Sequence, residues 1–98
     1  MVHPSDGIRP QDIELAIATI EKALERCNAL KGDTTFEGRL ARSRVIIDVQ
    51  MLRVPLRFRK PLLAMLNDLI SRLETGREST FTIEDFKNAI AQTVQNQG

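Results

Sequence analysis

The sequence predicts an all-α fold: a small four-helix bundle in a single helical domain of residues 10–95, preceded by a flexible N-terminal tail of residues 1–9. In four successive segments, apolar residues recur at intervals of three, four and seven, as they do along the buried side of a helix. Prolines or capping residues bound these segments. The strand-like run Val45–Val49 has no second strand to pair with, and a lone strand is unstable.

The first helix is expected over residues 10–31. Pro10 suits a first turn, where its missing N–H costs nothing, and Gly32 is the natural C-cap. We interpret Cys27 as core and not as a nucleophile, because no base is near it in the sequence and free cysteines are commonly buried. It closes an apolar stripe made of Ile13, Ile17, Ile20, Leu24 and Cys27.

The central helix, expected over residues 35–54, differs from the others because it has two apolar faces. One face comprises Phe36, Leu40, Ile47, Met51 and Val54. The roughly opposite face comprises Val45, Val49 and Leu52. A surface helix of a small monomer needs only one apolar stripe. We therefore expect dimerisation through the central helix, with Val45, Val49 and Leu52 as the interface of a homodimer.

The residues around this segment favour a helix over a strand. Thr34 and Glu37 have the spacing of a capping box, and Arg44 and Asp48 have the spacing of an ion pair on a helix surface. Gly38 weakens the first turns. It marks either a close approach of the backbone or a helix start a few residues later.

Two further helices are expected over residues 61–75 and 82–95. The prolines at 55 and 61 disfavour helix in the residues before them, which predicts a break from about Val54 to Lys60. Pro61 then opens the third helix. At the fourth helix, Thr82 and Asp85 form a capping box, and Phe81 and Phe86 are spaced for a hydrophobic staple across it.

Composition is typical of a globular chain, but charge is unevenly distributed. The 98 residues are 42% apolar and 28% charged, with one cysteine and no apolar run long enough to span a membrane. We expect a cytoplasmic protein with no membrane partner. Residues 39–60 carry a charge of +6, and the other residues carry −5. The basic residues of this segment form a predicted partner-binding surface: Arg39, Arg42, Arg44, Arg53, Arg57, Arg59 and Lys60.

Motifs for catalysis, metals and cofactors are missing from the sequence. There is no zinc-ligand spacing, phosphate-binding glycine loop or calcium loop, and the single histidine, His3, has no second His or Cys beside it. We therefore expect neither an enzyme nor a bound cofactor or metal.

Two functional interpretations remain. The first is a small helical protein–protein interaction module, such as an adaptor, chaperone or regulator, that binds itself and another protein. The alternative is a nucleic-acid-binding regulator that uses the basic segment 39–60 on phosphates. The near-neutral pI of about 7.9 argues against the alternative, because DNA-binding domains are usually basic throughout.

Overall fold

A computed structural model describes residues 9–57 and 59–95, with the side chains of residues 94 and 95 left out. The described chain is all-helical, with no strand, and this confirms the all-α prediction and the helical conformation of Val45–Val49. The helices lie close to their predicted positions: α1 (Pro10–Ala29), α2 (Phe36–Met51), α3 (Lys60–Thr75) and α4 (Ile83–Gln95). The predicted tail lies outside the described residues except for Arg9, whose guanidinium pairs with Asp12 at 3.0 Å.

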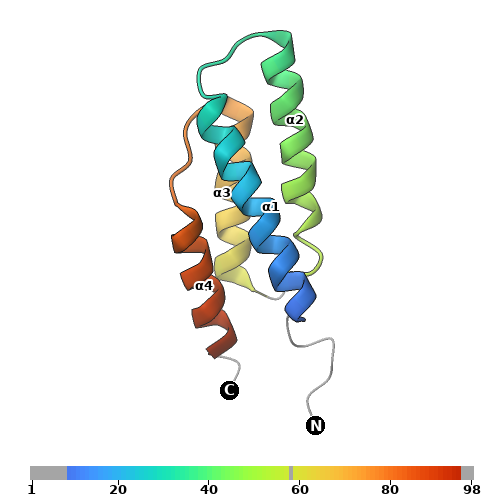
Figure 1. The fold of residues 1–98 in the computed structure, drawn as a ribbon, viewed down its shortest axis with the longest axis vertical. Helices are drawn as coiled ribbons and strands as arrows, with labels where there is room; N and C mark the ends of the chain where they lie inside the picture. Colours follow the sequence, from blue (N-terminus) through green and yellow to red (C-terminus); the bar gives the residue numbers. More distant parts are fainter. Residues whose placement is uncertain (1–8, 58, 96–98) are drawn as a thin grey trace.

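The four helices run alternately up and down along the bundle (Figure 1). Both α1 and α3 pack against all the other helices. In contrast, α2 packs on α1 and α3, and α4 packs on the same two helices without touching α2 within the described residues. The outward side of α2 is therefore covered by no other described helix.

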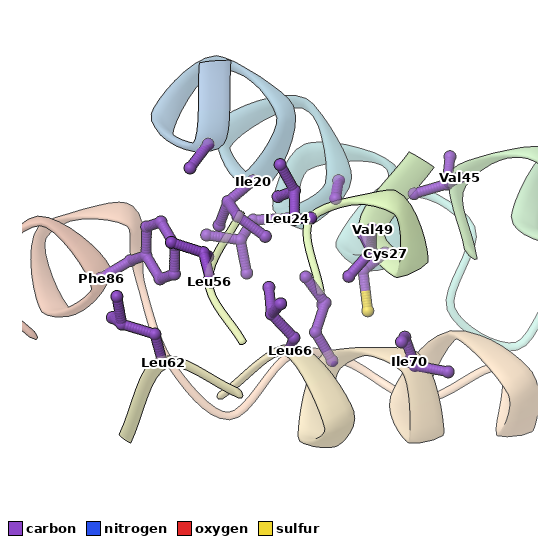
Figure 2. Close-up of a cluster of buried hydrophobic side chains, with 14 of the residues drawn as sticks. Ile20, Leu24, Cys27, Val45, Val49, Leu56, Leu62, Leu66, Ile70 and Phe86 are labelled. Carbon is purple, nitrogen blue, oxygen red and sulfur yellow. The ribbon is translucent and has the colours of Figure 1, made fainter. Parts of the chain in front are cut away.

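One apolar cluster forms the core, and every helix contributes to it. Figure 2 shows Ile20 and Leu24 from α1, Val45 and Val49 from α2, and Leu66 and Ile70 from α3 entering this cluster. Phe86 is the largest fully buried side chain and anchors α4. Leu56, in the turn between α2 and α3, is also buried, so the segment predicted to break the helix contributes a side chain to the core.

The start of α2 corrects one predicted contact. The N-cap is Thr35 and not Thr34, because the Thr35 hydroxyl accepts a hydrogen bond from the Gly38 N–H at 3.0 Å. Asp33 accepts hydrogen bonds from the Thr35 N–H at 2.8 Å and from its hydroxyl at 2.6 Å. A Cβ on Gly38 would lie 2.4 Å from the Asp33 carboxyl carbon, so this glycine marks a close approach.

The start of α4 confirms the predicted capping. The Asp85 N–H donates to the Thr82 hydroxyl at 3.2 Å, and the Thr82 N–H donates to the Asp85 carboxylate at 2.9 Å. The rings of Phe81 and Phe86 stack across this cap with centroids 6.3 Å apart. These contacts fix the angle at which α4 enters the bundle.

The loops after α1 and α3 meet at one end of the bundle. The Gly32 N–H donates to the Gly76 carbonyl at 2.8 Å, and both glycines have positive φ, at 75° and 68°. The Cys27 thiol donates to the Arg77 carbonyl at 3.1 Å. Cys27 is buried, as predicted, and burial raises the pKa of its thiol.

Candidate functional site

The structure reverses the predicted roles of the two faces of α2. Val45, Val49 and Leu52 were expected to be the face left over for a second copy, but they are 8%, 0% and 2% exposed. They pack into the core of the single chain against α1 and α3. These three residues are therefore unavailable to a second copy, and the predicted interface is corrected accordingly.

The opposite side of α2 is the exposed one. We call the outer face the exposed residues Phe36, Leu40, Ile47 and Met51 of α2 together with Val54 in the turn that follows it. Their exposed fractions are 74%, 43%, 56%, 68% and 65%, respectively. At 1.5 Å per residue, the stretch from Phe36 to Met51 extends over about 22 Å. Among the described residues, one other large apolar side chain is comparably exposed, Leu15 of α1. Large apolar side chains clustered on a surface typically mark an interaction site, whereas scattered ones do not.

Arg42 belongs to the inner face of α2 and is buried with it. The inner face of α2 contains Gly38 and Arg42 beside Val45 and Val49, and all four are buried. Arg42 is only 9% exposed, and its guanidinium donates to the carbonyls of Leu30 at 3.2 Å and Asp33 at 2.6 Å. These hydrogen bonds satisfy the buried charge and join α2 to the preceding loop.

Polar residues border the outer face on both edges. By helical geometry, Glu37, Arg44 and Asp48 follow one edge, and Arg39 and Gln50 follow the other. All five are exposed. The predicted Arg44–Asp48 ion pair is not formed: within the described part of the chain, neither side chain joins an ion pair. Both charges therefore remain available to a partner.

The predicted basic surface loses one member. Arg42 is buried and serves the fold. Arg53 is exposed and donates to the Asn67 side chain, while Arg59 is partly buried. Phe58 lies outside the described residues. Exposed basic side chains of segment 39–60 are Arg39, Arg44, Arg53, Arg57 and Lys60.

An open hollow of about 350 Å³ lies where the two loops meet. It is lined by Lys31, Gly32, Arg72, Gly76, Arg77 and Glu78. The charge of Lys31 is partly balanced there, because its ammonium lies 3.6 Å from the Glu78 carboxylate. The lining contains no pair of acids and no histidine.

Over the described ranges, no three His, Cys, Asp or Glu side chains are grouped to hold a metal ion. None of the helices described is both long and apolar enough to cross a bilayer. His3 lies outside the described residues.

Comparison with known proteins gives no match. No protein-family model fits the chain, and neither a curated protein nor a solved structure is significantly similar to it.

Proposed function

We propose that this chain is a small, non-catalytic protein–protein interaction module, and that it docks through the outer face of α2. One observation carries the proposal: four large apolar side chains on one side of α2, and Val54 in the turn that follows it, are each at least 43% exposed, while the other side of α2 is already in the core. The dimerisation predicted through the central helix belongs to this proposal, now on the outer face.

The outer face is large enough to matter energetically. Fully burying one such side chain contributes about 1.5–3 kcal/mol. Five of them, only partly exposed now, supply a sum comparable to the roughly 4–15 kcal/mol that association costs. The polar residues along both edges then add specificity through hydrogen bonds and ion pairs, as at the rim of typical interfaces.

Nucleic-acid binding is the alternative that the exposed arginines keep open. Arg39, Arg44, Arg53, Arg57 and Lys60 are exposed and cationic, as phosphate contacts need to be. This alternative does not account for the apolar outer face, because phosphate contacts are made by polar and charged groups. Binding through these residues predicts a steep loss of affinity with added salt.

The test is affinity purification of the tagged chain from its native host, with nuclease treatment and mass spectrometry. Three versions are compared: the parent, Ile47→Glu on the outer face, and Leu15→Glu on α1. Ile47 and Leu15 are both 56% exposed, so the two variants change equally exposed apolar residues. A protein, including an untagged copy of this chain, that parent and Leu15→Glu retain and Ile47→Glu loses supports the proposal. The proposal is contradicted if nuclease treatment abolishes the retention of the protein, or if Ile47→Glu retains it as the parent does.

A further inference from the structure

We infer that the occupant of the outer face is a second copy of this chain, whose α2 lies antiparallel to the first across a two-fold axis near position 45. This inference rests on the proposed function and names the partner for the same surface. Three features of α2 support it: the symmetry of its apolar stripe, the charges along its edges and the charge difference between its ends.

The apolar stripe reads almost the same in both directions. From Phe36 to Val54, with Ser43 included, the intervals are 4, 3, 4, 4 and 3 residues. Reversing the stripe about position 45 places Phe36 opposite Val54 of the second copy and Leu40 within one residue of Met51 of the second copy. Ser43 then meets Ile47 of the second copy. Each large side chain is matched by a smaller or more flexible one, which suits close packing of two helices.

The edges of the outer face complement themselves in this arrangement. A two-fold axis perpendicular to both helices sets each edge against the same edge of the second copy. Arg44 then lies about one helical turn or less from Asp48 of the second copy, and neither charge is paired within the described chain. On the other edge, Arg39 approaches the Gln50 amide of the second copy. The two Arg39 side chains stay about 18 Å apart along the axis, whereas the two Arg44 side chains lie about 3 Å apart along it, so their repulsion is offset only where each pairs with Asp48 of the other copy.

The two ends of α2 differ in charge, and this favours the antiparallel direction. Arg53, Arg57, Arg59 and Lys60 follow one end, and Asp33 and Glu37 lie at the other. A parallel pair would bring the two basic ends together, and their repulsion would oppose association. An antiparallel pair separates the basic ends and sets each near the acids of the other copy.

The available area fits a dimer of modest size. The exposed parts of the five outer-face side chains amount to on the order of 500 Å² per copy. The polar residues along the two edges extend this area toward the roughly 800 Å² per partner of a standard interface. A self-paired α2 therefore has enough surface without any rearrangement of the bundle.

The first experiment measures the mass of the purified full chain by sedimentation velocity from about 1 to about 200 µM, a range set by ordinary dimer affinities. The parent and Leu15→Glu should pass from monomer to dimer within it. Ile47→Glu should keep its helical circular dichroism and weaken the dimer about 100-fold or more, because it places two carboxylates near the axis. A parent that stays monomeric at the highest concentration overturns the inference, and so does an Ile47→Glu variant that still forms the parent's dimer.

The second experiment tests the direction with two charge variants. Arg44→Asp makes this edge wholly acidic, and Asp48→Arg makes its central part basic. Each variant alone should dimerise more weakly than the parent, and an equimolar mixture should form a heterodimer at least about tenfold tighter than either homodimer. The heterodimer contains one helix of each variant, so charge effects within a single helix equal the average over the two homodimers and cancel in this comparison. A mixture with no such preference overturns the antiparallel pairing.

The two proposals fail separately. A monomeric parent removes the second copy as the occupant. Affinity purification with Ile47→Glu and Leu15→Glu would still decide whether the outer face binds a different protein, and loss of that retention as well would remove the interaction module itself.

Discussion

The helices α2 and α4 both carry phenylalanine and aliphatic residues, but they use them in opposite ways. In α4, Phe86 and Ile90 are buried, at 0% and 5% exposure. In α2, apolar residues lie on both sides, and Phe36 remains 74% exposed. The difference follows from how many apolar faces each helix has, because a position beside α1 and α3 can cover only one of them. Whether an apolar residue is buried therefore depends on which face of its helix meets the rest of the bundle.

The sharpest test of this contrast is within α2 itself. Val49→Glu should destabilise the chain by more than about 4 kcal/mol, because it places a carboxylate in the core. Ile47→Glu should change the stability of the monomer by no more than about 0.5 kcal/mol. Urea unfolding at low protein concentration measures both. Equal losses would show that the two faces of α2 are not distinguished as the structure has them.

The two phenylalanines provide the second test. Phe86→Ala should cost about 3–5 kcal/mol, because a fully buried ring leaves a cavity at the anchor of α4. Phe36→Ala should cost less than about 0.5 kcal/mol. Thermal unfolding followed by circular dichroism gives both values. A parent-like midpoint for Phe86→Ala would mean that α4 does not dock.

A third test concerns the buried arginine of the inner face. Arg42→Ala should cost about 2–3 kcal/mol, since it leaves the Leu30 and Asp33 carbonyls without their charged donor and removes the packing of a long side chain. Arg44→Ala, on the exposed edge, is the matched control and should be close to neutral in the monomer. Denaturant midpoints compare the two, and a larger effect at Arg44 would refute the structural role of Arg42.

The cap of α2 should give a smaller effect. Thr35→Ala should cost about 1 kcal/mol, because the Gly38 N–H loses its acceptor. Thr34→Ala should cost close to nothing, since Thr34 is exposed and is not the N-cap. The same unfolding experiment compares the two variants. A larger loss of stability for Thr34→Ala than for Thr35→Ala would support the capping box expected from the sequence.

The smallest expected effect is on pH dependence. Hydrogen bonds from the Thr35 hydroxyl and N–H hold the pKa of Asp33 below its ordinary value of 3.8. Asp33 therefore stabilises the fold fully above pH 3.8, and this contribution is lost as the pH falls through the lower pKa of the folded state. Melting temperatures between about pH 6 and pH 2 should fall less for Asp33→Asn than for the parent. Parallel curves would show that Asp33 makes no such contribution.

Local sequence signals predicted most of the fold. The staple of Phe81 and Phe86 and the cap of Thr82 and Asp85 depend on residues close together in the chain, and all four behave as predicted. In α2, periodicity revealed two apolar faces but not which one meets α1 and α3. That choice depends on tertiary contacts, including the Arg42 hydrogen bonds to a loop 9 and 12 residues away in sequence.

The proposed docking surface therefore lies on the helix that the sequence singled out, but on the opposite side from the predicted interface. Residue size does not identify the buried side, because the larger residues Phe36 and Met51 are exposed while the smaller Val45 and Val49 are buried. Gly38 was a better guide. A helical glycine pressed against Asp33 belongs to a face that approaches the rest of the chain closely, and it lies on the side of Val45 and Val49. An exposed face leaves room for a larger residue at such a position.

The thiol of Cys27 gives this chain a built-in reporter of local opening. It is the single cysteine in the sequence, it is 1% exposed, and it is held against the Arg77 carbonyl where the loops after α1 and α3 meet. A disulfide reagent reacts with the thiolate, which burial disfavours, so labelling requires molecules in which this end has separated. The labelling rate under native conditions therefore measures how often the two loops part, without any added probe or substitution.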